Sequence, residues 1–139
     1  MKRIKLFSAL FNALAVMLVS AGVYAGARSS VEVTVALDGD GVAISAQGNE
    51  ADAYNSLDAN QYIGCGGTAV FGWCQAHDAT ADADGLVNAA FCSTDKPELI
   101  AHIRSVAADS FVRFTIDALT GECVTISVSH NSFYRPKAP

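Results

Sequence analysis

Several familiar chemical signatures are missing from this sequence of 139 residues, and each absence argues against a class of function. The G-x-S-x-G and H-E-x-x-H motifs are absent, and there is no catalytic-cysteine signature. No two of the four cysteines have the C-x-x-C spacing that is typical of zinc sites and of thioredoxin-like redox sites. The glycine-rich residues 64–67 lack the GxxxxGK[ST] spacing of a phosphate-binding loop. We therefore predict no metal site and no cofactor.

Basic residues are scarce as well. Nine Lys and Arg stand against fourteen Asp and Glu, which gives a net charge of −5. Three of the nine are Lys2, Arg3 and Lys5, so the rest of the chain has six basic and fourteen acidic residues and a net charge of −8. A domain this acidic repels the phosphate backbone of nucleic acids, and we expect no nucleic-acid partner.

The N-terminal residues have the pattern of a secretory signal peptide. Basic residues at positions 2–5 precede an apolar run over residues 6–23, and small residues precede two candidate cleavage points, after Ala25 and after Ala27. An uncleaved anchor is the alternative, because the run is about long enough to span a bilayer. No cysteine precedes Cys65, which argues against a lipoprotein. We expect residues 1–25 to be a bacterial signal peptide, the mature chain to be periplasmic or secreted, and no membrane association after cleavage.

All the cysteines follow this segment: Cys65, Cys74, Cys92 and Cys123. An even number of cysteines in an exported chain predicts two disulfides. Three connectivities are possible, and we slightly favour Cys74–Cys92 with Cys65–Cys123, because residues 74 and 92 fall in strands that we expect to pair. The faces inferred for these strands do not, however, place the two cysteines directly opposite each other.

A helix is predicted over residues 96–108. Asp95 and Glu98 fit a capping box, and Pro97 falls in the first turn, where its missing N–H costs nothing. Apolar residues then recur at helical spacing and define one buried face: Leu99, Ile100, Ile103, Val106 and Ala107.

A β-hairpin follows this helix. Apolar side chains alternate with polar ones, and the alternation pairs residue 116 with 124, 114 with 126 and 112 with 128. This register leaves a three-residue loop, Leu119–Gly121, in which Gly121 supplies a positive φ. The opposite face is predicted to be polar and solvated, and to include Asp117 and Cys123. We interpret part of it, together with two aromatic residues beyond the last strand, as a candidate binding surface: Arg113, Thr115, Thr125, Ser127, Phe133 and Tyr134.

Four further strands are predicted before the helix. Residues 31–46 form a hairpin in which Leu37 pairs with Val42 and Gly39-Asp40 is a two-residue type II′ loop. Residues 47–61 have no period and many turn-forming residues, so they are predicted to be the longest loop. Glycines around Cys65 indicate unusual backbone angles or close packing. Two more strands, over residues 68–76 and 86–92, place a set of side chains on one face: Phe71, Trp73, Gln75, Val87, Ala89 and Phe91.

Together these elements predict a single α+β domain over residues 28–132. It consists mostly of an antiparallel β-sheet of about six strands, which can curl, with one amphipathic helix packed on it. Two disulfides supplement a core of modest size. Residues 133–139 contain two prolines and are predicted to be a frayed C-terminal tail.

Three functions from different classes are compatible with this sequence. A non-enzymatic binding or inhibitor-like module, with a protein or a glycan as its ligand, is favoured because the domain is small, acidic and without a catalytic motif. A small secreted hydrolase that uses His130 or His77 is the second. A calcium-stabilised structural protein, through the acidic loop at residues 78–84, is the third. On the EF-hand pattern, Phe91 occupies the position of the bidentate glutamate, which favours a solvated turn instead.

Overall fold

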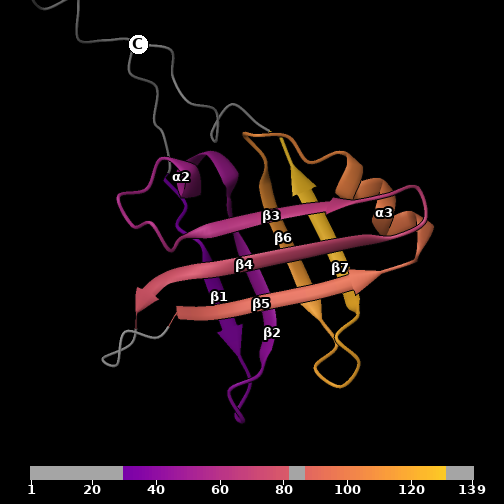
Figure 1. Cartoon of the computed structure of the whole chain (residues 1–139), viewed down its shortest axis with the longest axis horizontal. Coiled ribbons are helices and arrows are strands. Elements are labelled where there is room, and N and C mark those ends of the chain that lie inside the picture. Colours follow the sequence, from indigo (N-terminus) through magenta and orange to yellow (C-terminus); the bar gives the residue numbers. More distant parts are fainter. Residues whose placement is uncertain (1–29, 82–86, 131–139) are drawn as a thin grey trace, which may run out of the picture.

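The computed structural model describes residues 30–81 and 87–130. Its seven strands form two antiparallel sheets that pack face to face, and the strands of one sheet cross those of the other steeply (Figure 1). The four-stranded sheet has the order β1 (Thr34–Leu37), β2 (Ala43–Asn49), β6 (Phe111–Ile116), β7 (Cys123–Ser129). The three-stranded sheet has the order β3 (Tyr62–Gly67), β4 (Gly72–Ala81), β5 (Val87–Thr94).

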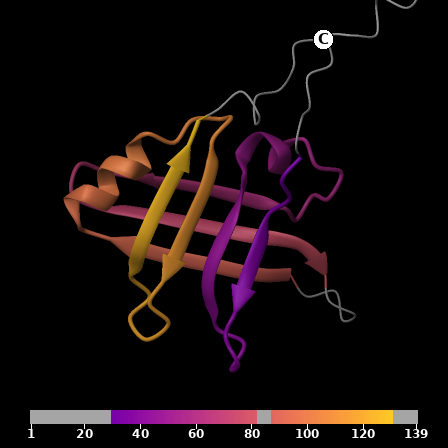
Figure 2. The ribbon, with the colours of Figure 1, turned by 180° about the vertical axis from the view of Figure 1, so that it is seen from behind.

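Two helices lie at the ends of this sandwich. The short helix α2 (Glu50–Tyr54) connects β2 to the segment that leads into β3, and α3 (Pro97–Arg104) lies against β7, β3 and β4 at the other end (Figure 2). The predicted dominance of antiparallel strands is confirmed. The strands form two sheets rather than one, because β2 pairs with β6 and leaves β3, β4 and β5 to pair among themselves. Alternation identifies the inward side chains but not the partner of each strand.

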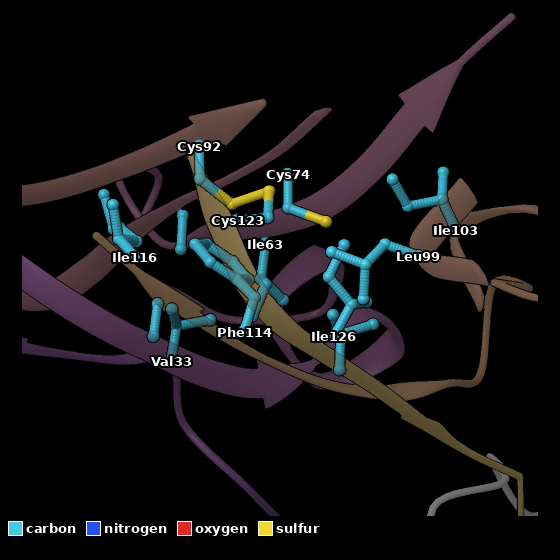
Figure 3. Packing of buried hydrophobic residues seen from close by; sticks show 14 of the residues in the cluster. Val33, Ile63, Cys74, Cys92, Leu99, Ile103, Phe114, Ile116, Cys123 and Ile126 are labelled. Atoms are coloured by element: carbon cyan, nitrogen blue, oxygen red, sulfur yellow. A yellow bond between two sulfur atoms is a disulfide. The ribbon is translucent and has the colours of Figure 1, made fainter. Parts of the chain in front are cut away.

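The hydrophobic core lies between the two sheets. Phe114 and Val112 of β6 are fully buried, and Phe114 lies at the centre of the labelled side chains in Figure 3. The three-stranded sheet contributes mostly small side chains to this core: Ile63, Cys74, Ala76, Ala90 and Cys92. Small residues on one sheet leave room for the large residues of the other, so the two inner faces interdigitate.

The β6–β7 hairpin confirms part of the predicted register. The 112–128 and 114–126 pairs form as expected, but a β-bulge at residues 115 and 116 places Ile116 opposite Cys123 instead of Val124. Gly121 has the expected positive φ of 73°, whereas the loop spans residues 118–121, one residue more than predicted. A bulge reverses side-chain parity. Cys123 therefore lies in the core rather than on the polar face, and Val124 is exposed.

The β1–β2 hairpin has a different turn from the one predicted. The N–H of Asp38 donates to the carbonyl of Val42 at 2.9 Å, which leaves a loop over residues 39–41. Gly41 has a φ of 80°, while Gly39 does not have a positive φ. The Asp38 carboxylate accepts the N–H groups of Asp40 and Val42 at 3.0 and 2.8 Å. These bonds stabilise a type I turn followed by a left-handed glycine, so the predicted type II′ loop is wrong.

The segment predicted to be the longest loop contains regular structure. β2 continues to Asn49, and α2 begins directly after it. The side chain of Asn49 caps α2, because its Oδ1 accepts the N–H of Asp52 at 3.0 Å. Five helical residues are too few to show a period in the sequence. The available signal was Asn49 followed by two acidic residues in the first turn.

The second helix, α3, is shorter than predicted. Leu99, Ile100 and Ile103 are buried as expected, but the helix ends at Arg104. Its N-cap residue is Lys96, which makes no side-chain capping bond, so the predicted Asp95–Glu98 capping box is wrong. Instead, the hydroxyl of Thr94 accepts the N–H of Lys96 at 3.1 Å, which turns the chain one residue later than expected.

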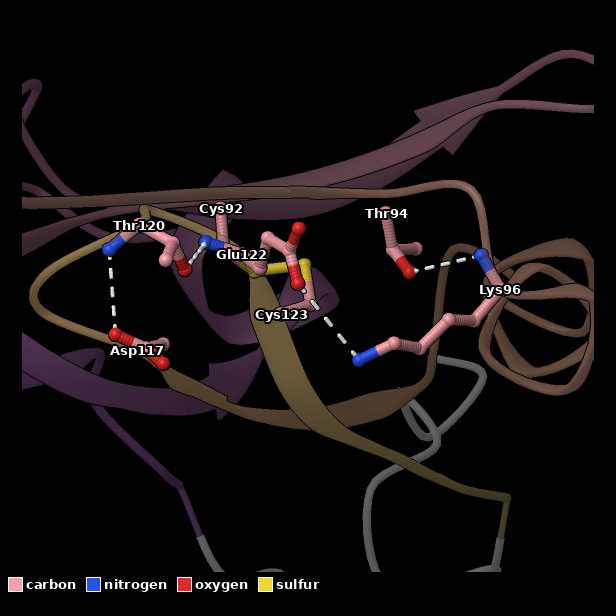
Figure 4. A network of polar contacts seen from close by, with 7 residues as sticks. All are labelled: Cys92, Thr94, Lys96, Asp117, Thr120, Glu122 and Cys123. Atoms are coloured by element: carbon pink, nitrogen blue, oxygen red, sulfur yellow. Dashed lines mark hydrogen bonds and ion pairs between the residues drawn. A yellow bond between two sulfur atoms is a disulfide. The ribbon is translucent and has the colours of Figure 1, made fainter.

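The two disulfides are Cys65–Cys74 and Cys92–Cys123, so the favoured connectivity is wrong. Cys65, Cys74 and Cys92 lie in one row across β3, β4 and β5, which also corrects the inferred faces. Cys74 bonds to the neighbour on its hairpin, and Cys92 bonds to Cys123 of the other sheet. Figure 4 shows this second disulfide beside the ion pair of Lys96 and Glu122, whose charged atoms are 3.8 Å apart.

Some predictions concern residues outside the described part of the chain. These are the signal peptide at residues 1–25 with its cleavage points at Ala25 and Ala27, and the tail at residues 133–139. Among residues 30–81 and 87–130, no helix combines the length and the apolar character needed to cross a bilayer. Two disulfides are typical of proteins that work in an oxidising, extracellular-type environment.

Candidate binding surface

The outer face of the three-stranded sheet carries large apolar side chains. Its strands pair so that the outward residues form three rows, each read across β3, β4 and β5: Tyr62–His77–Ala89, Gly64–Gln75–Phe91 and Gly66–Trp73–Ser93. The predicted position of Phe91 on the same face as Gln75 and Trp73 is therefore confirmed. We refer to these nine residues as the aromatic face.

Glycines of β3 allow two of the aromatic rings to lie close against the sheet. A Cβ atom on Gly66 would be 2.8 Å from Cζ2 of Trp73, so the indole covers the position of a missing side chain. A Cβ atom on Gly64 would be 3.0 Å from Oη of Tyr62, which covers its neighbour in the same way. Close packing at these glycines was predicted, and none of them has the positive φ that was the other expectation. The result is a low surface of rings rather than a set of projecting side chains.

This aromatic face is open to solvent. Phe91 is 57% exposed and Tyr62 is 40% exposed, and Phe71, in the turn that joins β3 to β4, is 45% exposed. In the part of the chain that the structure describes, no helix or strand covers the face (Figure 1). Its nine residues include no Asp, Glu, Lys or Arg. Enrichment in aromatic residues and depletion of charge are characteristic of the centres of protein interfaces.

A groove of about 860 Å³ adjoins this face at the edge strand β3. α2 and residues 55–61 form one wall, and residues 62–65 of β3 form the other. Tyr62 belongs both to the groove and to the aromatic face, so the two surfaces are continuous. This groove was not predicted from the sequence, because it depends on α2, which was not predicted either.

Glu50 is the half-buried carboxylate of this groove. A Cβ atom on Gly64 would be 3.3 Å from Glu50 Oε1, which places this oxygen near the hydroxyl of Tyr62. The Glu50 side chain has no hydrogen bond or ion pair with any described residue. Burial, which removes water from the carboxylate, raises the pKa of Glu50 from 4.5 to about 7.

The polar surface predicted from the sequence lies on the opposite side of the molecule. Arg113, Thr115, Thr125 and Ser127 share the outer face of β6 and β7, as expected from their alternation. Figure 2 shows the four-stranded sheet from the side opposite to the three-stranded sheet. The two threonine hydroxyls are 2.7 Å apart and hydrogen bonded to each other. Phe133 and Tyr134, the other members of the predicted surface, lie outside the described residues. The binding role of this surface stays a prediction.

The two histidines considered for catalysis lie in different surroundings. Nδ1 of His130 is 3.2 Å from the hydroxyl of Ser110, but Ser110 is fully buried and its Oγ also accepts the N–H of Ala107 at 2.8 Å. This serine therefore links the end of β7 to the turn before β6 and is not accessible to a substrate. His77 is exposed on the aromatic face, where its ring centroid is 6.4 Å from that of Tyr62.

The acidic loop considered for calcium lies only partly within the described residues. Asp78 points into the opposite face from His77, and its two carboxylate oxygens accept from the backbone and side chain of Asn88 at 3.1 and 2.9 Å. Asp82 and Asp84 lie outside the described residues. Within the described ranges, no three His, Cys, Asp or Glu side chains are grouped as metal ligands would be. The calcium hypothesis stays untested.

Comparison of the chain with protein-family models, with curated proteins and with solved structures gave no match. The two outer faces of the sandwich nevertheless differ in a way that bears on function. The face around Arg113 and Thr125 is largely polar, as expected for a solvated sheet. The aromatic face is apolar and open, and it adjoins the groove between α2 and β3.

Proposed function

We propose that this protein is an exported, non-enzymatic binding module that docks a protein partner on its aromatic face. The observation that carries this proposal is the open set of large apolar side chains on β3, β4 and β5. Apolar patches of this kind on small soluble domains mark interaction sites. The signal-like N-terminus and the two disulfides support export from a bacterial cell to the periplasm or the medium.

The composition of the aromatic face favours a protein over a glycan. Tyr62, Trp73 and Phe91 supply rigid apolar area, and the polar groups between them are few: Gln75, His77 and Ser93. The centre of a protein interface is rich in aromatic residues and poor in charge, with hydrogen bonds mostly at its rim. Glycan binding is the alternative that the experiment below distinguishes.

The hydrolase hypothesis receives less support from the geometry. A serine nucleophile must reach the substrate and be activated by a base within hydrogen-bond distance. Ser110 is within reach of His130 but is fully buried, and its hydroxyl already accepts a backbone N–H. His77 and Asp78 are adjacent in the sequence and point to opposite faces of β4, so they do not act as a pair.

Site-specific photo-crosslinking tests the proposal. A photoreactive phenylalanine analogue replaces Phe91, which preserves the aromatic ring, and a matched variant carries the analogue at Thr125 on the opposite face. Irradiation in the periplasm or in culture medium should give a defined protein adduct from position 91 and none from position 125. Trp73→Ala should reduce the yield of the adduct at position 91 at least tenfold, because the large aromatic ring on the central strand of the patch is lost.

Two results would contradict the proposal. Equal adduct yields from positions 91 and 125 would show non-specific contact, and a yield that Trp73→Ala leaves unchanged would place the partner elsewhere. A glycan array provides the second arm with the same variants. Saturable binding to one glycan class that depends on Trp73, without any protein adduct, would replace the protein partner with a sugar.

A further inference from the structure

The groove beside the aromatic face has a distinctive electrostatic character. Titratable side chains along it are Glu50 and Tyr54 from α2, Asp58 from the segment after α2, and Tyr62 from β3. The described residues that line the groove include no Lys, Arg or His. Asp58 accepts the N–H of Asn60 within its own turn, at 2.9 Å. Glu50 has no such donor among the described residues.

The carboxylate of Glu50 is consequently a partly desolvated acceptor without a partner among residues 30–81 and 87–130. Burial removes water from a carboxylate and destabilises its charged form, which is the cause of the raised pKa of about 7. Water compensates this charge only in part. A cation that enters the groove would supply the missing donor and would gain more there than at a fully solvated acid, because the local dielectric is lower.

The neighbouring rings restrict the shape of that cation. Tyr62 lies across Gly64, so its ring and its hydroxyl are next to Glu50 Oε1. Tyr54 is 90% exposed at the rim of the groove. A planar guanidinium can stack on tyrosine rings while it donates to a carboxylate, and it is more weakly hydrated than an ammonium group. The groove volume of about 860 Å³ is enough for such a side chain and for the chain segment that carries it.

We propose that the groove between α2 and β3 binds an arginine side chain of the protein partner, with its guanidinium paired to Glu50 and its stem packed against Tyr54 and Tyr62. This inference rests on the proposed function, because it names the chemistry by which the same partner is recognised. The aromatic face supplies apolar contact area. The groove, which is continuous with it through Tyr62, supplies the charged contact that sets register and orientation.

The inference is tested with short peptides that fill only the groove. Isotope-labelled protein is titrated with the acetylated, amidated peptide Ala-Ala-Arg-Ala-Ala, and the backbone amides are followed by NMR. The amides of Glu50, Tyr62 and Gly64 should shift together and saturate at millimolar concentration. A peptide with citrulline in place of arginine has nearly the same shape without the charge. It should bind at least tenfold more weakly, and a lysine peptide should bind with intermediate affinity.

Two variants distinguish a specific pair between the peptide's guanidinium and Glu50 from a general attraction of a cationic peptide to an acidic protein. Glu50→Gln should weaken the arginine peptide at least tenfold, whereas Glu98→Gln, which removes one exposed acid of α3, should leave the affinity unchanged. Affinity of the wild type should rise about tenfold between pH 6 and pH 8, as Glu50 loses its proton. The Glu50→Gln variant should lose this rise. Equal affinity of the arginine and citrulline peptides, or no effect of Glu50→Gln, would overturn the inference.

The outcomes also distinguish this inference from the proposed function. A Trp73-dependent adduct at position 91, together with no binding of the arginine peptide, would overturn the groove assignment alone. Binding of the arginine peptide without any adduct at position 91 would overturn the docking function of the aromatic face alone. Sedimentation of the free protein tests whether a second molecule of this chain occupies the groove. A dimer that dissociates in the Glu50→Gln variant would replace the protein partner with another molecule of this chain.

Discussion

The two disulfides should contribute unequally to stability, and the difference follows from where each one lies. Cys65–Cys74 joins directly opposed residues of one hairpin, with a sequence separation of 9. Cys92–Cys123 joins the two sheets across the core, with a sequence separation of 31. A cross-link stabilises the folded state mainly by restricting the unfolded chain, and the restriction grows with the logarithm of the loop length.

The chain-entropy relation gives the expected magnitudes. A loop of 31 residues corresponds to about 3.7 kcal/mol at 25 °C, and a loop of 9 residues to about 2.6 kcal/mol. The expected difference is therefore about 1 kcal/mol in favour of the disulfide between the sheets. Each contribution is large for a small domain, because the whole free energy of unfolding is typically about 5–15 kcal/mol.

The contribution of each disulfide is measured by reducing it, because substitution of its cysteines would also leave a cavity and add a second cost. In the Cys65→Ala/Cys74→Ala variant only Cys92–Cys123 remains, and in the Cys92→Ala/Cys123→Ala variant only Cys65–Cys74 remains. Urea unfolding of each variant, oxidised and reduced, then gives the contribution of the remaining disulfide without removing an atom. Reduction should cost about 1 kcal/mol more in the first variant. Equal costs, or a larger cost for Cys65–Cys74, would refute loop length as the deciding factor.

Three further predictions concern single residues. Gly41→Ala and Gly121→Ala should each cost about 1–2 kcal/mol in urea unfolding, because their φ values of 80° and 73° disfavour a Cβ atom, whereas Gly39→Ala should be nearly neutral. Phe114→Ala should cost about 3–5 kcal/mol and Phe91→Ala less than about 1 kcal/mol, since the first is fully buried and the second mostly exposed; similar costs would contradict the assignment of Phe91 to a binding surface. Folding raises the pKa of Glu50 from 4.5 to about 7, so the native state binds more protons than the unfolded state between these pH values. The wild type should therefore lose stability relative to Glu50→Gln as the pH rises from 4.5 to 7. A constant difference in the free energy of unfolding across this range would contradict the raised pKa.

The local elements of this fold are largely legible in the sequence. Alternation identified the inward residues of β6 and, apart from Cys123 and Val124, those of β7. Glycine identified the positive φ of the loop between the two strands. Both signals are short-range, because they reflect the geometry of neighbouring residues. The bulge at residues 115 and 116 is not visible in this way, since the same alternation fits a register with or without an extra residue.

The disulfide prediction relied on the pairing of the strands that carry residues 74 and 92, which does form, but Cys74 bonds to Cys65 and Cys92 bonds to Cys123. The position of Cys123 depends on the bulge at residues 115 and 116. Without it, Cys123 points to solvent and has no reason to meet Cys92. With it, Cys123 points into the core toward the three-stranded sheet. The division of the strands into two sheets was likewise not predictable from local patterns. It depends on β2 pairing with β6, a contact between residues 62 to 70 positions apart, for which the sequence carries no local signal.

The candidate site was predictable only in part. The sequence placed Trp73 and Phe91 on one face of paired strands, which is confirmed, but it did not show which face is outward. The groove depends on α2 and on the free edge of β3, and neither was predicted. The signal that was available is the alternation of glycine with large aromatic residues across β3 and β4, which indicates rings that lie against a sheet rather than in a core.

The three-stranded sheet has small side chains on its inner face and large ones on its outer face, and this arrangement is the strongest reason to assign the outer face to function rather than to folding. Its inner face consists largely of alanine and cysteine, while its outer face carries Tyr62, Trp73 and Phe91. Burial of an aromatic side chain removes about 150–250 Å² from water at about 25 cal/mol per Å², so stability alone favours the opposite arrangement. An inverted pattern of this kind leaves favourable burial energy unused in the isolated domain. That energy becomes available only when a partner covers the aromatic face, which is why the docking function accounts for residues that the fold does not require.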